Sequence, residues 1–409
     1  MSDRIDRTHT VLALGTAQTL AWASSYYLPA MLAAPMARDL GVATPTVFAV
    51  FSMALIVSAL VGPLAGRLID RHGGRPVLLG TNVLFAAGLA TLGAAQGTAS
   101  LVAAWLLLGL AMGAGLYEAA FAALVRLYGT GSRNAITGIT LLAGFASTVG
   151  WPLSAWMEVQ LGWRGACFVW AGLHLVLGLP LNAMLPRPPA RGTLATEAAT
   201  TAPAAGTAVA PAAALPPPPR YTAALLSLVF TLVWFVSTGM AAHLPTLMQA
   251  AGGTLALAVA VGALVGPAQV AGRLFEFGLL RRVSPLAVAR AATLGHPIGA
   301  LLLWFLGAPA AAAFAILHGL GNGILTIAKG TLPLALFGAG AYGARQGWIA
   351  LPGRALQGLA PWLFGLALER WGAGALWLSG ALGLSAAAAL LLLPRARPAA
   401  AAAPAATTV

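Results

Sequence analysis

Charged side chains are scarce in this chain of 409 residues. Asp, Glu, Lys and Arg make up 8% of the sequence, whereas about a quarter is usual for a soluble globular protein. Hydrophobic residues make up 59% of the chain, and the mean hydropathy is +0.87. A chain with so few charges cannot cover a water-facing surface, and its composition predicts a membrane protein.

Two further absences exclude classes of function. The single cysteine, Cys167, excludes an intramolecular disulfide framework and a cysteine-cluster metal site within one chain. The sequence contains no G-x-x-x-x-G-K-[ST] phosphate loop, so ATP is not expected to drive this protein. The net charge of +13 reflects where the arginines lie and requires no nucleic-acid partner. We expect no enzymatic activity, no cofactor and no metal site.

The chain has one lysine, Lys329, in the apolar stretch GILTIAKGTLP (323–333). Scarce lysine beside abundant Arg, Ala and Gly is typical of a GC-rich bacterial genome, so the rarity carries no functional weight. The position does, because a charge at bilayer depth costs about 3 kcal/mol on insertion scales. Such a charge tends to be retained where it faces a cavity or a partner.

Apolar runs of the length that crosses a hydrocarbon core of about 30 Å occur twelve times. They predict membrane helices at 10–37, 45–69, 76–96, 99–127, 133–159, 164–185, 221–250, 256–279, 284–306, 310–337, 343–368 and 374–393. Residues 186–220 are rich in Pro, Ala and Thr and have no apolar period, which predicts a disordered cytoplasmic linker; the tail 394–409 has the same character. We therefore predict an all-α membrane protein of two six-helix bundles, 1–185 and 221–393.

The arginines fix an orientation for these helices. Seventeen of them fall on the side of the amino terminus and three on the other side, and only Arg354 belongs to neither group. Positive residues concentrate on the cytoplasmic side of a membrane protein. We expect a multi-pass protein of the bacterial inner membrane with both termini in the cytoplasm.

The two halves repeat each other in sequence. ALVGP at 59–63 recurs at 263–267, and GRLID at 66–70 recurs as GRLFE at 272–276. Five such matches keep their order along both halves, which indicates two six-helix repeats. Parallel repeats of this kind underlie alternating access in many secondary transporters.

The loop after the second helix carries the motif G-x-x-x-D-R-x-G-x-R over residues 66–75. On this motif and its position the chain resembles the major facilitator superfamily, and GWR at 162–164 is also similar to that family. More loosely, the chain is similar to bacterial monocarboxylate and oxalate/formate carriers. The resemblance implies a cytoplasmic latch that holds the halves together in the outward-open state, made of Gly66, Asp70, Arg71, Gly73, Arg75 and Arg126. It also implies Glu276 with Arg273 as a second copy of the latch. The alternative is a loop that only sets topology.

Three charged residues are predicted to lie at bilayer depth: Glu118, Lys329 and Arg354. The resemblance implies that the helices carrying them reach a central cavity. The planar fork of Arg354 suits bidentate capture of a carboxylate, so we expect it to anchor a substrate; the alternative is a buried ion pair with Glu118. Glu118 is expected to couple protons, or else to form a static bridge between the fourth and tenth helices.

Polar side chains recur at helical spacing on three predicted helices. We expect these stripes to line the cavity, the alternative being packing between helices, whereas His174 and His296 are expected to pack. The stripes are His318, Asn322, Thr326 and Lys329 on the tenth helix, Arg354 and Gln357 on the eleventh, and Gln18, Trp22 and Tyr26 on the first.

The sequence thus favours a proton-coupled secondary transporter of a small carboxylate-type organic anion, working as a symporter. Its expected partners are the solute, protons and the lipid bilayer, with no nucleic acid, and we expect a monomer. The alternative is a proton-antiporting exporter of amphipathic drugs or metabolites. In that reading Glu118 exchanges a proton for a cationic compound, and the aromatic residues form the pocket.

Overall fold

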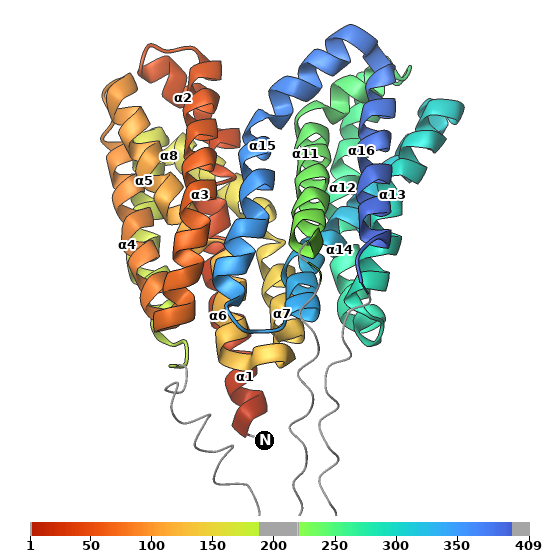
Figure 1. Cartoon of the computed structure of the whole chain (residues 1–409). Coiled ribbons are helices and arrows are strands. Elements are labelled where there is room, and N and C mark those ends of the chain that lie inside the picture. The colour runs from red at the N-terminus through yellow and green to blue at the C-terminus, as the bar shows by residue number, and fades with distance from the viewer. Residues whose placement is uncertain (1, 188–218, 220, 395–409) are drawn as a thin grey trace, which may run out of the picture.

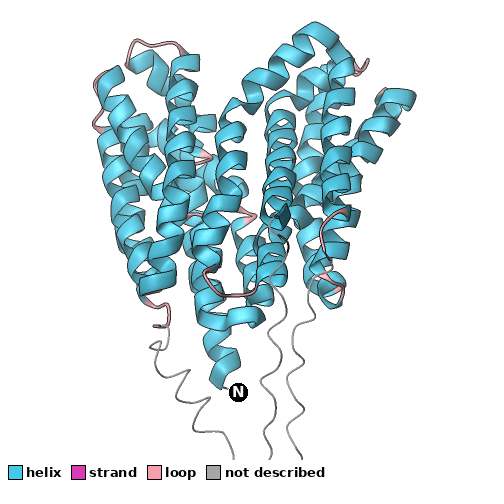
Figure 2. Ribbon diagram, viewed as in Figure 1, coloured by secondary structure: helices cyan, strands magenta, loops and turns pink. Residues whose placement is uncertain are grey.

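The structure is a computed structural model that describes residues 2–187, 219 and 221–394. The predicted linker 186–220 and tail 394–409 lie almost entirely outside the described residues, so the domain boundaries placed there stay predictions. The described chain is helical and contains no strand, with short loops between the helices (Figure 2). The prediction of an all-α membrane fold is confirmed.

The amino-terminal half forms one bundle. Its helices are α1 (Ser2–Ser24), α2 (Leu28–Asp39), α3 (Thr44–His72), α4 (Gly74–Gly93), α5 (Thr98–Gly115), α6 (Tyr117–Tyr128), α7 (Arg133–Ala143), α8 (Ala146–Leu173) and α9 (Leu179–Ala183). The carboxy-terminal half forms the second bundle, with α11 (Tyr221–Ala250), α12 (Leu255–Gly278), α13 (Pro285–Leu306), α14 (Ala311–Phe337), α15 (Tyr342–Trp371) and α16 (Ala375–Leu391).

Each predicted apolar run is helical, but three runs in the first half are broken. Residues 25–27 separate α1 from α2, extended Leu116 separates α5 from α6, and residues 144–145 separate α7 from α8. Conversely, α8 joins the end of the fifth run to the first part of the sixth, with the turn between them at Gly162 (φ 70°), a conformation that favours glycine. Within the described residues, seven helical stretches are long and apolar enough to cross a membrane, and two of these join several helices.

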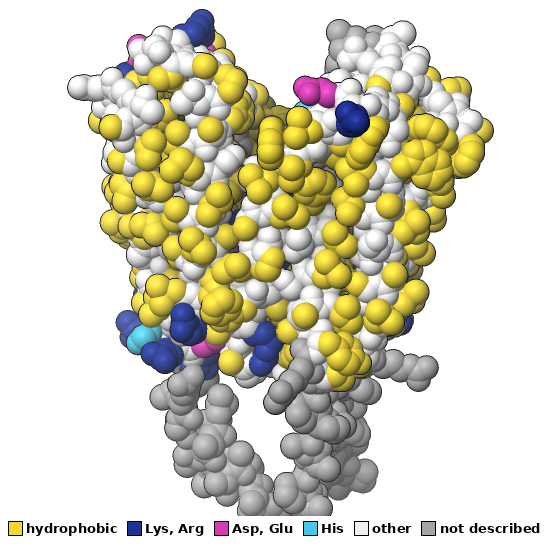
Figure 3. All heavy atoms as spheres, turned by 45° about the horizontal axis from the view of Figure 1, so that its top comes forward, with side chains coloured by type: hydrophobic (Ala, Val, Ile, Leu, Met, Phe, Trp, Pro, Cys, Tyr) yellow, Lys and Arg dark blue, Asp and Glu magenta, His cyan; other side chains and the backbone are white. Residues whose placement is uncertain are grey.

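The two bundles stand side by side and diverge toward one end (Figure 1). We call the face where the amino terminus lies the terminal face, and the opposite face the open face. The space-filling view shows a hollow between the two bundles at the open face, and Lys and Arg side chains gathered near the terminal face (Figure 3). The molecule is therefore closed at the terminal face and open at the other.

The closure rests on backbone contact between α3 of one half and α15 of the other. A Cβ added at Gly66 would overlap the Gly343 carbonyl, and one added at Gly347 would lie 2.5 Å from Pro63. These glycines have ordinary helical geometry, so here the constraint is space. Only glycine permits the two helices to approach so closely.

We expect Gly66→Ala to weaken closure of the terminal face, because the added methyl group overlaps backbone that cannot rotate away. Spin labels at the exposed residues Thr130 and Ala287 report the separation of the halves at this face, and the native Cys167 is buried. Double electron–electron resonance is expected to show a new population of longer distances between the two labels. Gly80→Ala is the matched control because its Cβ meets open space; an unchanged distance distribution in Gly66→Ala would contradict the role of this contact.

Candidate substrate site and gate

A buried ion pair joins the two halves. The Arg354 guanidinium on α15 donates a hydrogen bond to the Glu118 carboxylate on α6. Only 7% of the Arg354 side chain and 13% of the Glu118 side chain are exposed. The break at Leu116 places Glu118 in the first turn of α6, where the helix dipole favours a negative charge. This is the pairing considered above as the alternative to a free substrate anchor.

Lys329 lies beside this pair and faces an aromatic ring. Its Nζ is 4.2 Å from the centroid of the Trp234 ring, and Arg354 Cζ is 5.6 Å from the same ring. Lys329 also interacts electrostatically with both Glu118 and Arg354. Two cations therefore share one carboxylate and one aromatic face, which leaves a positive local charge suited to an anion.

Aromatic residues of the first half face these cations. Tyr26, in the break between α1 and α2, accepts a hydrogen bond of 3.0 Å from Gln357 Nε2 and is also hydrogen-bonded to Thr238 of α11. The Trp22 ring lies 5.2 Å from Tyr26 and 4.9 Å from Tyr117. Its buried indole N–H has no hydrogen-bond partner in the described structure. The first half thus presents three aromatic rings and one indole N–H that has no hydrogen-bond partner in the described structure.

Other predicted cavity residues lie elsewhere. Gln18 is 1% exposed and donates a 2.7 Å hydrogen bond to the Gly115 carbonyl, tying α1 to α5 within the first half. Thr326 bonds to the Asn322 carbonyl of its own helix. His318 and Asn322 line a separate pocket inside the second half. The structure therefore brings together Tyr26, Glu118, Lys329, Arg354 and Gln357, with Trp22 adjacent, whereas His318 and Asn322 line the separate pocket.

Trp234, Thr238 and Tyr117 were not among the predicted substrate residues. The internal repeat carried a signal for the first two. Tyr27-Leu-Pro and His243-Leu-Pro are 216 residues apart, and the same offset relates Gln18 to Trp234 and Trp22 to Thr238. The polar and aromatic stripe of the first helix thus has its counterpart on the seventh.

The Asp70 carboxylate lies at the gate on the terminal face, where it binds backbone of the other half. Its two oxygens accept hydrogen bonds from Gly343 N at 3.0 Å and from Ala344 N at 2.9 Å. These N–H groups belong to the first turn of α15, which has no side-chain cap of its own. Asp70 therefore caps α15 from across the interface, and Arg345 of the same turn attracts it electrostatically.

The predicted cluster around Asp70 is arranged as follows. Gly73 ends α3 with φ 85°, in keeping with the tight turn of the motif. Arg71 is exposed, Arg75 is half-buried, and Arg126 lies in the last turn of α6 with a buried, unpartnered Nε. The sequence prediction did not include the α15 backbone as a partner of Asp70.

The second half supplies a different acid to the same gate. Glu276 of α12 pairs with Arg133 of α7 at 2.7 Å and accepts a 3.1 Å hydrogen bond from Thr137. Glu276 was expected, together with Arg273, as the second copy of the latch, and the structure gives its ion-pair partner as Arg133 of the opposite half. Arg133 begins α7 and reaches across the interface, and the Arg273 guanidinium also reaches the opposite half, where it lies against Gly144. Both motif acids thus bind the opposite half.

Comparison with known proteins agrees with this geometry. The sequence profile of the Major Facilitator Superfamily matches residues 14–310. The chain belongs to this superfamily. It is therefore a transporter protein and not an enzyme.

Solved structures share the fold of this superfamily member. The human organic anion transporter MFSD10 (TETRAN) superposes with a TM-score of 0.68 at 18% identity, covering 95% of this chain and 100% of that chain. The Escherichia coli fucose:proton symporter FucP superposes with a TM-score of 0.69 at 14% identity, covering 94% and 98%, and one FucP structure is in the outward conformation. The sequence has no significant match among curated proteins.

We expect Glu118→Gln and Arg354→Gln each to destabilise the protein, because each leaves an unpaired charge in a buried site, at a cost of roughly 3 to 5 kcal/mol. The double variant removes both charges and is expected to recover most of the loss. Thermal unfolding in one detergent measures the stability of the two single variants and of the double variant. Asp39→Asn, in the exposed pair with Arg164, is the control with a small expected shift. A double variant as unstable as the sum of the singles would show that the two charges do not act as a pair.

Proposed function

We propose that this superfamily member carries a small carboxylate-type organic anion across the bacterial inner membrane by alternating access, coupled to proton movement. The observation that carries the proposal is the pair of cations, Lys329 and Arg354, sharing the single carboxylate of Glu118 between the two halves. This excess of positive charge would attract a solute carboxylate entering from the hollow. Arginine can bind it through two hydrogen bonds, and lysine adds a compact charge.

The proposed cycle places the terminal face in the cytoplasm, as the arginine distribution favours. The described conformation is then outward-open, with Gly66, Asp70, Glu276 and Arg133 holding the inner gate shut. The gate and the ion pair share α15, with Gly347 and Arg354 seven residues or about 10 Å apart along the helix. Movement of α15 would therefore change both the gate and the ion pair.

Protonation of Glu118 would couple proton movement to binding of the solute anion. A neutral carboxyl group releases Arg354 from its ion pair, and the freed guanidinium can bind the solute anion in its place. One proton and one anion then occupy a site that held one internal ion pair, so its net charge is unchanged. Preserving the charge of a buried site is favourable because desolvation penalises any unpaired ion.

The aromatic wall supports a second candidate, a proton-antiporting exporter of amphipathic compounds. The Trp22 ring centroid lies 5.2 Å from that of Tyr26 and 4.9 Å from that of Tyr117. Rings of this kind can bind an apolar body or a cation. In this candidate Glu118 exchanges its proton for the cationic compound.

Uptake of labelled carboxylates into proteoliposomes with an imposed pH gradient tests the leading proposal. We expect Lys329→Gln and Arg354→Gln to lower uptake about tenfold or more, because each removes a charged hydrogen-bond donor. Glu118→Gln is expected to keep exchange at equal pH and to lose acceleration by the gradient. Arg370→Gln and Glu369→Gln, exposed at the end of the same helix α15, are the matched controls.

Two results would overturn the anion proposal. Wild-type rates in both cation variants would show that these groups do not bind the solute. Absence of carboxylate transport, together with expulsion of cationic amphipathic compounds that stops in Glu118→Gln, would establish the exporter instead.

A further inference from the structure

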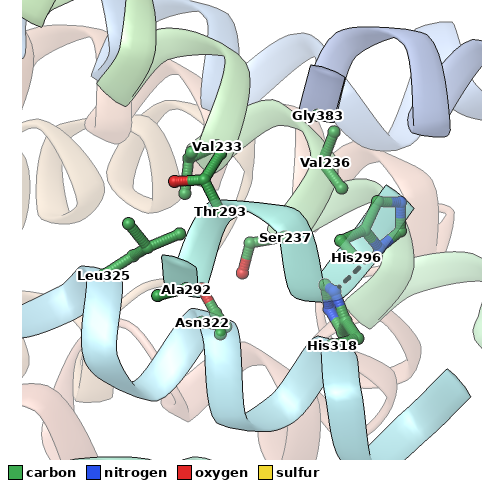
Figure 4. Close-up of a pocket in the computed structure, with 11 residues that line it drawn as sticks. Val233, Val236, Ser237, Ala292, Thr293, His296, His318, Asn322, Leu325 and Gly383 are labelled. Atoms are coloured by element: carbon green, nitrogen blue, oxygen red, sulfur yellow. Dashed lines mark hydrogen bonds between the residues drawn. The ribbon is translucent and has the colours of Figure 1, made fainter. Parts of the chain in front are cut away.

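A polar pocket lies inside the second half, apart from the ion pair. We call it the side pocket; it lies among α11, α13, α14 and α16, and its polar lining consists of Ser237, Thr293, His296, His318 and Asn322 (Figure 4). The rest of its wall is aliphatic or glycine, and no Asp, Glu, Lys or Arg lines it. The side pocket is therefore polar without a fixed charge.

The side pocket shares two helices with the candidate substrate site. On α11, Ser237 of the pocket neighbours Thr238, which is hydrogen-bonded to Tyr26. On α14, Asn322 precedes Lys329 by seven residues, about 10 Å along the helix. The half-buried lining residues are Val233, Ser237 and Asn322, and the other lining residues are buried. The least covered side of the pocket thus lies on α11 and α14, the helices that carry Trp234 and Lys329.

Buried hydrogen-bonding groups form the floor. Thr293, His296 and His318 are 3%, 7% and 5% exposed. The two Nδ1 atoms of His296 and His318 are 3.0 Å apart, so one ring donates to the other (Figure 4). Buried His296 Nε2 has no hydrogen-bond partner in the described structure. A buried polar atom without a partner is costly, and a ligand that completes its hydrogen bond relieves that cost.

The hydrogen-bonding groups of the floor determine which chemical group can bind there. Imidazole nitrogens, hydroxyls and an amide can donate to or accept from a hydroxyl or carbonyl group. They offer no fixed positive charge to a second carboxylate. The site thus suits the uncharged polar end of a solute whose other end is anionic.

We propose that the side pocket is a specificity subsite that binds the hydroxyl or carbonyl group of a bifunctional carboxylate held by Lys329. The protein would then prefer hydroxy or keto acids to plain carboxylates of the same length. This inference rests on the proposed function, since Lys329 must hold the carboxylate end. A site with unpaired buried groups discriminates against an analogue that cannot pair them.

Binding to the purified full-length protein in one detergent tests the subsite. The probes are butyrate, hexanoate and octanoate, each compared with its ω-hydroxy form by isothermal titration. We expect the hydroxy form to bind about tenfold more tightly at the length that spans the two sites, as one added hydrogen bond allows. Ser237→Ala, Asn322→Leu and His296→Phe should each reduce this ratio severalfold while leaving the plain acid unaffected.

Controls separate the subsite from the proposed function. Ser385→Ala, an exposed serine bonded within α16, is expected to keep the ratio. Lys329→Gln is expected to weaken both members of each pair equally. Ser237→Ala removes a single oxygen, so it remains informative where His296→Phe does not fold.

Three outcomes would overturn the inference. Equal binding of both forms at every length, or an unchanged ratio in all three pocket variants, removes the subsite and leaves the anion site intact. Failure of every probe to bind wild-type protein contradicts the proposed function, and the subsite falls with it.

Discussion

The low polarity of the membrane interior is the constraint on which this structure depends. An ionised group at that depth must find its partner inside the protein. Glu118 and Arg354 meet this requirement across the boundary between the halves, so their pairing is also a contact between the halves. Whatever changes the charge of one partner changes the energy of holding the halves together.

At the gate, acidic side chains likewise find their partners in the opposite half, and these partners include backbone N–H groups as well as a side chain. Asp70 and Glu276 occupy equivalent positions of the two repeats, yet they bind different groups. Asp70 caps the bare first turn of α15, and the contact between Gly66 and Gly343 brings that turn within reach. Glu276, one methylene longer, pairs with the side chain of Arg133. The repeats therefore place an acid on each side of the gate, and local packing decides its partner.

The sequence predicted the helices well because length and apolarity decide what can span a bilayer. It did not predict the breaks at Leu116 or at residues 144–145, since apolar residues continue through both. It placed Glu118, Lys329 and Arg354 in cavity helices by combining their charge with the family resemblance. Whether Arg354 anchors a substrate stays a prediction.

For the polar stripe on the tenth helix, the sequence predicts a shared face but not the neighbours of each side chain. Helical spacing puts His318, Asn322 and Lys329 near one face, but a face 100° wide meets more than one neighbour. Lys329 meets Trp234 beside the ion pair, whereas His318 meets His296 within the bundle. The partner of Asp70 was equally inaccessible, because backbone N–H groups leave no residue signature in a sequence.

The order of groups along α14 and α15 connects the gate to the charges. Gln346, one helical turn from the Asp70 cap, donates a 3.0 Å hydrogen bond to the Lys329 carbonyl, and Tyr342 donates one of 2.8 Å to the Gly330 carbonyl. The backbone that carries the lysine is thus held by the helix that carries Arg354. A displacement of α15 at the gate must move both cations relative to Glu118. Conversely, an anion that binds both cations favours whichever position of α15 brings them together, and this differential binding is what a solute needs in order to shift a conformational equilibrium.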